Sequence, residues 1–205
     1  MLNQSNQTET AIFEAAEKLF LEKGYATVST TAIAKEAGCS QAMVHYYYRS
    51  KEKLFTLVFK RRVTPFLKSL LELKYVDEPF EKKMEKRIYG HFDILRQNER
   101  MPLMLLNEIA TNKALMDQLF ETMSEVPKPI LSILQQELDT AYQQGKIRQT
   151  KAEELVFLVA SLNLTAVLIK PILQAISGLS ADGWDFLMEQ RKQENLQIVL
   201  RSIRP

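Results

Sequence analysis

Four residues within positions 29–53 have the types and spacing that a helix-turn-helix requires. Ala34 is small enough for two helices to approach closely, and Gly38 suits a left-handed turn between them. Ser40 is a candidate N-cap for the second helix, and Val44 falls where an apolar side chain faces the first helix. Such a pair of short helices places one helix in the major groove of DNA. The segment therefore predicts a DNA-binding surface.

The elements that position this segment are predicted to be helices. An apolar stripe at helical spacing covers Thr8–Lys23, and Gly24 follows as a stop signal. Ser50 is a candidate cap for a fourth helix that continues toward Tyr75, with Pro65 expected to bend it. The other predicted helices are a short one after the caps Ser29, Thr30 and Thr31, Ser40 to about Tyr47, Phe80–Arg100, Pro102–Asn112, Ala114 to about Ser124, Pro129–Gly145, Thr150–Gly178, and a last one capped by Asp182.

The composition favours the same fold class. Among 205 residues only 6 are Gly and 7 are Pro, too few for a β-rich chain. We expect an all-α protein of about nine helices, with a three-helix DNA-binding domain at residues 1–55 and a larger regulatory domain at 56–205. Residues 1–62 hold nine Lys and Arg against six Asp and Glu, a mildly basic balance that suits phosphate but also fits a solvated face.

The run Thr30–Ser40, continued by Val44–Phe55, resembles the tetracycline-repressor (TetR) family. The resemblance includes the Gly-Tyr-x-x-Val-Ser approach at 24–29, the Tyr-x-Tyr end of the second helix at 46–48, and Ser-Lys-Glu-x-Leu-Phe at 50–55. It covers about residues 9–56. It implies a homodimer that reads a palindromic operator in double-stranded DNA and responds to a small molecule.

The resemblance also implies which residues meet DNA. Residues of the second helix would face base edges or the nearby backbone, where Gln41 can pair with an adenine edge and Ala42 and Met43 can touch a thymine methyl group. Lys51 would contact a phosphate at a helix N-terminus. The full implied set is Ser29, Thr30, Thr31, Gln41, Ala42, Met43, His45, Tyr46, Tyr47 and Lys51. We expect Tyr48 to be mostly buried, and Tyr47 to pack as readily as it contacts phosphate.

The second half of the chain suggests dimerisation and ligand binding. Leu155–Ile169 is apolar nearly all round, so it needs cover on most sides, from a second copy or from a monomer's own core. The family favours the dimer, through helices at about 152–177 and 183–203. Flexible thioethers and aromatic rings can line an apolar pocket or simply form core. The candidate pocket residues are Met84, Ile88, Phe92, Met101, Met104, Phe120, Met123 and Asn163.

Other classes of function have less support in the sequence. It has no phosphate-binding glycine loop, nucleophile elbow or clustered metal ligands, so we expect no enzyme activity, cofactor or metal. His45 and His91 fall in different predicted domains, and the single cysteine, Cys39, excludes a disulfide. The apolar run Leu155–Ile169 is shorter than the roughly 20 residues of a bilayer span. We therefore expect a cytoplasmic regulator released from its operator by an apolar or amphipathic ligand, or alternatively a DNA-binding protein controlled by a protein partner or acting architecturally.

Overall fold

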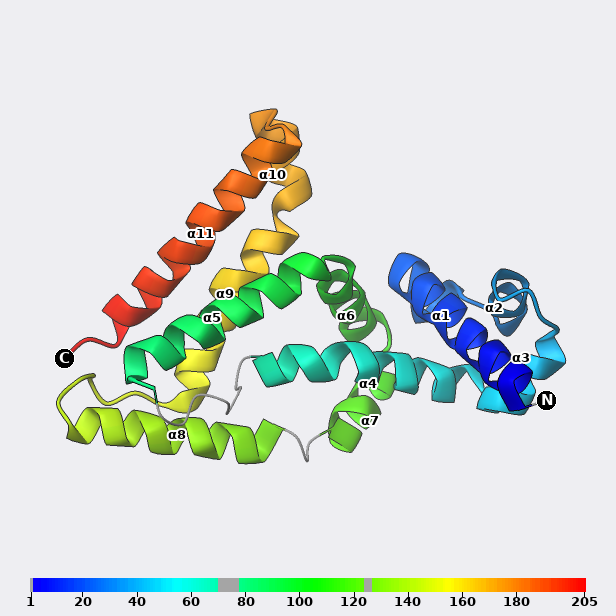
Figure 1. Ribbon diagram of the computed structural model, residues 1–205, viewed down its shortest axis with the longest axis horizontal. Coiled ribbons are helices and arrows are strands. Elements are labelled where there is room, and N and C mark those ends of the chain that lie inside the picture. Colours follow the sequence, from blue (N-terminus) through cyan, green and yellow to red (C-terminus); the bar gives the residue numbers. More distant parts are fainter. Residues whose placement is uncertain (1, 70–77, 124–126) are drawn as a thin grey trace. The chain divides into compact units, whose positions relative to one another are not determined.

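The computed structural model describes residues 2–69, 78–123 and 127–205. Within these ranges the chain forms eleven helices and no strand, which confirms the all-α prediction and raises the count above the nine expected. The chain divides into two compact units (Figure 1). Unit 1 comprises Met1–Thr64 and Arg100–Thr122, and unit 2 comprises Pro65–Glu99 and Met123–Pro205.

Unit 1 contains the predicted helix-turn-helix and two helices from later in the sequence. Its helices are α1 (Leu2–Thr27), α2 (Thr30–Glu36), α3 (Gln41–Tyr48), most of α4 (Lys51–Ser69), α6 (Arg100–Thr111) and α7 (Lys113–Met123, of which the last residue is grouped with unit 2). The helix α6 packs against α1, so a segment far along the sequence supports the N-terminal helices. Aromatic side chains fill the core, where the rings of Phe20 and Phe55 meet edge to face at 5.1 Å.

Unit 2 is an assembly of longer helices. Its helices are α5 (Phe80–Gln97), α8 (Pro127–Gln143), α9 (Ala152–Leu168), α10 (Lys170–Ser177) and α11 (Ala181–Ser202). Three of them, α5, α9 and α11, lie side by side, and α10 caps the far end of the α9–α11 pair (Figure 1). The core is apolar and includes Met84 and Ile88 of α5 and Leu155 of α9. Burial of these faces is the main stabilising term of the unit.

Most helix signals of the N-terminal region are confirmed. Gly24 breaks the helical geometry near the end of α1 with φ of 77°, although a last turn continues to Thr27. Ser29, Ser40 and Ser50 each accept a backbone N–H three residues ahead, as N-cap side chains do. The helix α4 runs through Pro65, and the predicted continuation to Tyr75 passes outside the described residues.

Two predicted boundaries near the C-terminus were wrong. The single helix expected at Thr150–Gly178 is two helices, α9 and α10, which meet at Ile169 with a bend of 49°. Pro171 is consistent with the break, since it lacks a backbone donor and lies in the first turn of α10, a position that proline favours. The cap of α11 is Ser180, whose Oγ accepts the Gly183 N–H, rather than Asp182.

Among the described residues, no single helix is long and apolar enough to cross a membrane. The bent pair α9 and α10 reaches that length and hydropathy only when the two helices are taken together.

Candidate nucleic-acid interface

The turn between α2 and α3 has the geometry that its residues predict. Gly38 takes φ of 66°, a conformation that a side chain would strain. The Cys39 N–H donates to the Ala34 carbonyl at 3.0 Å and the Gly38 N–H to the Lys35 carbonyl at 3.3 Å, the two bonds of a Schellman cap. Ser40 then starts α3. The angle between the two helices is thus fixed by local hydrogen bonds.

The inward faces of α2 and α3 hold the pair on its support. Ala34 and Val44 are each only 3% exposed, as the helix-turn-helix reading requires. Tyr48 is also buried, and its hydroxyl donates to the Glu9 carbonyl of α1 at 3.0 Å. Burial raises the pKa of Tyr48 to about 12, so the phenol stays protonated and remains a donor. The expectation that Tyr48 is buried is therefore confirmed.

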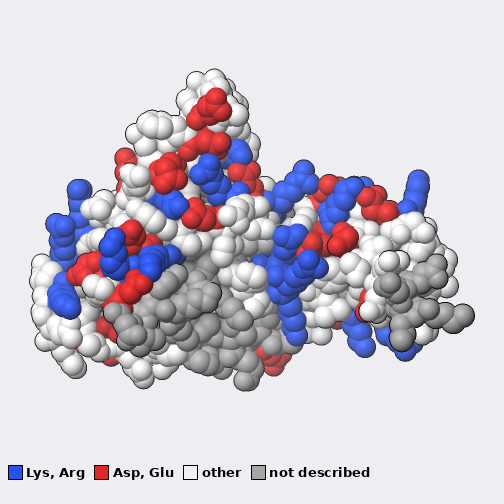
Figure 2. Space-filling model, in the orientation of Figure 1, with Lys and Arg blue, Asp and Glu red and all other residues white. Residues whose placement is uncertain are grey.

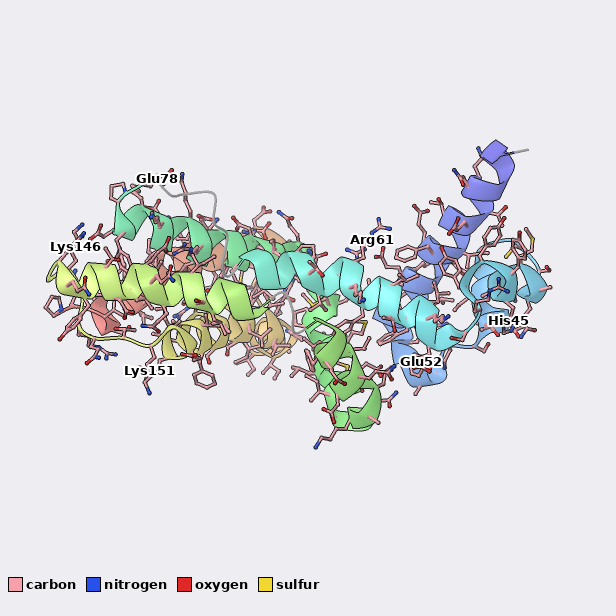
Figure 3. All side chains as sticks on the ribbon, turned by 90° about the horizontal axis from the view of Figure 1, so that it is seen from below. His45, Glu52, Arg61, Glu78, Lys146 and Lys151 are labelled. Atoms are coloured by element: carbon pink, nitrogen blue, oxygen red, sulfur yellow. The ribbon has the colours of Figure 1, made fainter. Side chains whose placement is uncertain are left out.

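A partly buried ion pair joins α1 to α4 within the same unit. Arg62 donates through Nε and Nη2 to the two carboxylate oxygens of Glu17, at 2.8 and 2.7 Å. This bidentate arrangement engages the Arg62 guanidinium, whereas Arg61 remains largely exposed on α4 (Figure 3). Of the basic run Lys60-Arg61-Arg62, Arg62 is thus a structural cation.

The residues implied to contact DNA all lie in unit 1 and remain accessible. Six are exposed and the other four are half-buried. His45 projects from α3, and Glu52 marks the first turn of α4 nearby (Figure 3). In the view of Figure 2, Lys and Arg side chains stand out over unit 1, with Asp and Glu among them. The exposed members are Ser29, Thr31, Gln41, Ala42, His45 and Tyr46, and the half-buried ones are Thr30, Met43, Tyr47 and Lys51.

A hydrogen bond across the helix pair orients the first residue of α3. The Gln41 amide donates through Nε2 to the Thr30 hydroxyl of α2 at 2.9 Å. The amide oxygen of Gln41 is then directed away from Thr30, and the second N–H remains to complete a bidentate contact with an adenine edge. The Thr30 hydroxyl in turn has its own hydrogen to donate, for example to a phosphate.

This bond gives a testable role to Thr30. Replacing Thr30 with valine keeps the shape but removes the acceptor, so the Gln41 side chain loses its fixed rotamer. We expect selectivity at the base pair that Gln41 reads to fall by about 1 kcal/mol, with a smaller change in affinity for random duplexes. Competition binding with single-base variants of the preferred duplex measures this. Unchanged selectivity in Thr30→Val would contradict the orienting role.

The aromatic end of α3 presents one exposed ring. Tyr46 is 71% exposed, and its ring meets that of the half-buried Tyr47 edge to face at 5.1 Å. Such a pair is a rigid element with little side-chain entropy to lose on binding.

Lys51 is the first residue of α4, as the sequence suggests, and its side chain bonds to backbone carbonyl groups. Its Nζ donates to the carbonyls of Tyr25 and Val28, both at 2.9 Å, and lies 4.1 Å from the centre of the Tyr25 ring. Burial lowers the pKa of Lys51. The ammonium group is therefore engaged by the last turn of α1 and by the loop residue Val28, while the implied phosphate contact stays a prediction.

Sequence reasoning overlooked Arg49, which lies between α3 and α4. Its φ is 63° and ψ −49°, and the Ser50 N–H donates to the Tyr48 carbonyl at 2.7 Å, which together make a strained γ-turn. The Arg49 residue is exposed directly after the end of α3. Its basic charge directly after the recognition helix is the signal that could have marked it.

The predicted pocket residues are divided between the two units. Met84, Ile88, Phe92 and Asn163 are buried in unit 2. In unit 1, Met101 and Met104 are buried on α6 while Phe120 is 41% exposed on α7. The side chain of Met123 lies outside the described residues. Within each unit, the buried members of this set are core side chains.

The polar member of that set belongs to a buried network in unit 2. Asn163 donates through Nδ2 to the Ile88 carbonyl and lies 3.0 Å from His91 Nδ1, while its Oδ1 accepts from Asn195 at 2.9 Å. His91, Asn163 and Asn195 are all 0% exposed. Because an imidazole is costly to charge in such a place, burial lowers the pKa of His91 to about 3.

A hollow of about 480 Å³ lies between α9, α10 and α11 in unit 2. Its lining is largely apolar, with Leu162, Leu173, Leu187 and Met188 among the contributors, and it contains none of the eight predicted pocket residues.

Known proteins resemble this chain in both of its parts. The family model of bacterial regulatory proteins of the tetR family matches residues 12–58. The fatty acid metabolism regulator protein of Bacillus subtilis is 24% identical over 148 residues, which are 72% of this chain and 75% of that protein. The transcriptional repressor BepR of Brucella suis is 23% identical over 70% of each chain. The crystal structure of the TetR-family regulator HI0893 from Haemophilus influenzae shares the fold, with a TM-score of 0.65, 17% identity and 98% coverage of both chains.

The paired helices, their caps and their exposed polar face define a helix-turn-helix DNA-binding protein. Residues 12–58 thus form a DNA-binding domain that matches the tetR family of bacterial regulatory proteins.

Proposed function

We propose that this regulator is a repressor that holds a palindromic operator as a homodimer and leaves it when a small apolar or amphipathic effector binds. This proposal is supported by the similarity of the chain to the transcriptional repressor BepR and to the fatty acid metabolism regulator protein. A ligand that prefers one spacing of the two DNA-binding domains can shift the population away from the operator-bound state. No catalysis, cofactor or metal is needed, and the cytoplasm is the proposed location.

The observation that carries the DNA-binding part is the oriented Gln41 on an exposed α3. In this proposal α3 enters the major groove, Gln41, Ala42, Met43, His45 and Tyr46 meet base edges, and residues of α2 meet phosphates. The division near residue 55, with the three N-terminal helices reading DNA and the remainder regulating them, is part of the same proposal.

The proposed dimer surface is the outer face of α9 and α11. Phe157 on α9 is 76% exposed and Phe186 on α11 is 67% exposed, while Ile172 and Ile176 of the adjacent α10 are also exposed. Large apolar side chains gathered on one part of a protein usually mark an interface. A two-fold pairing of this face would supply the symmetry that a palindrome requires.

A charge on this face is expected to separate the subunits. Phe157→Asp should change the protein from dimer to monomer at micromolar concentration, as measured by sedimentation velocity, and should weaken operator binding at least about tenfold. Tyr142→Asp is the matched control, because Tyr142 is an exposed aromatic residue on α8 of the same unit. A Phe157→Asp protein that remains dimeric would exclude α9 as the interface.

The effector part is tested by thermal unfolding with small apolar and amphipathic compounds. Saturation at 100 times the dissociation constant stabilises a protein by about 2.7 kcal/mol. A compound that stabilises the protein and displaces it from DNA supports the proposal. Control by a protein partner gains support if no such compound is found.

A further inference from the structure

A carboxylate on α6 is buried in the DNA-binding unit. Glu108 is 0% exposed, and its Oε1 accepts the backbone N–H of Tyr25 at 2.7 Å, across 83 positions of sequence. Its Oε2 is also buried and has no hydrogen-bond partner among the described residues. Ionised side chains are seldom buried in this way unless they are paired, because desolvation opposes their charge. The position of Glu108 therefore calls for an explanation beyond packing.

The backbone around Tyr25 is shaped to receive this carboxylate. Gly24 has φ of 77° and ψ of 165°, which turns the following N–H out of the helix. A Cβ atom at Gly24 would lie 3.1 Å from Glu108 Oε1 and 3.1 Å from Asn107 Nδ2, so a side chain there would crowd the contact. The hydrogen bond and the glycine thus form one feature, in which α6 holds the end of α1.

Lys51 binds the carbonyl group of Tyr25, whose N–H is bound by Glu108. The Tyr25 carbonyl and the Val28 carbonyl both accept from Lys51 Nζ at the start of α4. The negative charge of Glu108 opposes the effect of burial and favours the charged form of Lys51. One peptide segment is therefore clasped between the buried Glu108 side chain on α6 and the Lys51 side chain on α4. Ser29, the cap of α2, follows directly after Val28.

We propose that Glu108 is a positioning residue for DNA binding: it fixes the segment Tyr25–Ser29, and through it the placement of α2 and α3. Glu108 itself is buried and therefore touches no DNA. This inference rests on the proposed DNA-binding role of α3. It implies that the placement of α2 and α3 depends on the position of α6. A shift of α6 of about 1 Å would break a 2.7 Å hydrogen bond and release the segment.

Two variants of Glu108 and one control test this role. Glu108→Ala removes the acceptor, whereas Glu108→Gln keeps an amide oxygen that can accept from Tyr25. Leu119→Ala on α7 is the control for lost packing, because Leu119 is 1% exposed in the same unit and makes no part of the clasp. The readouts are affinity for the preferred duplex and for a random duplex, hydrogen exchange of the Tyr25 amide, and melting temperature, with binding measured well below melting.

The expected results differ among the variants. Glu108→Ala should bind the preferred duplex about tenfold more weakly and exchange the Tyr25 amide at least about tenfold faster. Glu108→Gln should restore both to within about threefold of the wild type, and Leu119→Ala should lower the melting temperature without either change.

Two results would overturn the proposal for different reasons. Suppose first that the wild type selects its preferred duplex. The positioning role is then contradicted if Glu108→Ala binds that duplex as tightly as the wild type, or if Glu108→Ala and Leu119→Ala lose affinity equally. A wild-type protein that does not distinguish the preferred from the random duplex would contradict the DNA-reading role, and the role of Glu108 with it.

Discussion

Replacing Lys51 with alanine is expected to lower the free energy of unfolding by about 2–4 kcal/mol. The side chain makes two charge-assisted hydrogen bonds, to the Tyr25 and Val28 carbonyls, and such bonds contribute up to roughly 1.5–3 kcal/mol each. The expected total is lower than their sum because Lys51 is half-buried and its burial opposes the charge. The variant also removes a cation over the Tyr25 ring and the positive charge near Glu108. Denaturant unfolding of the full chain measures the loss.

The neighbouring Lys53 provides the matched control. It is exposed on the first turns of the same helix, so Lys53→Ala should change stability by less than about 0.5 kcal/mol. The structure also predicts that Lys51→Ala changes the salt dependence of DNA binding by less than the one unit of slope that a lost phosphate contact produces. A full unit of slope with unchanged stability would show that Lys51 meets phosphate in the complex and that the structural account of this residue is wrong.

Acidification from pH 7.5 to 5 is expected to destabilise the protein by about 2 kcal/mol through His91 alone. The pKa of His91 is about 3 in the folded protein, because the ring is buried, and 6.5 when the ring is exposed to solvent in the unfolded chain. Between these values the unfolded chain binds a proton that the folded chain does not. The free energy of unfolding is therefore not reduced by His91 well above pH 6.5. Below pH 6.5 it falls by about 1.4 kcal/mol for each pH unit, until the folded form also binds the proton near pH 3.

The variant His91→Gln isolates this contribution. Its unfolding free energy should lose about 2 kcal/mol less than that of the wild type over the same pH range, whereas His45→Gln, at an exposed position, should follow the wild type. An NMR titration of wild-type His91 gives a second readout that needs no variant. A ring that protonates above pH 6 would contradict the buried neutral imidazole.

The helix-turn-helix was predictable because its signals are local. Gly38, Ser40 and Ser50 act on backbone groups within three or four residues, so the letters alone specify the turn and the caps. The break at Ile169 was missed because the apolar pattern continues from Leu155 across it, and Pro171 looks the same in a kinked helix as at the start of a new one.

The features that the sequence did not reveal depend on contacts between distant segments. A glutamate such as Glu108 is expected at the surface, and nothing near it in sequence indicates that it bonds to Tyr25. The candidate pocket set combined Met84 with Met101 because both lie in the methionine-rich middle of the sequence, although α5 and α6 belong to different units. The hydrogen bond of Gln41 to Thr30 likewise appears only when α2 and α3 are folded together.

The central claim is that α3 of a symmetric dimer reads a specific DNA sequence. Selection of a random duplex library on the purified protein, followed by sequencing, tests it most directly. We predict an enriched palindrome with two half-sites, whose base preference at one position in each half-site is lost in Gln41→Ala. No enrichment at moderate salt by a protein shown to be folded would contradict the claim.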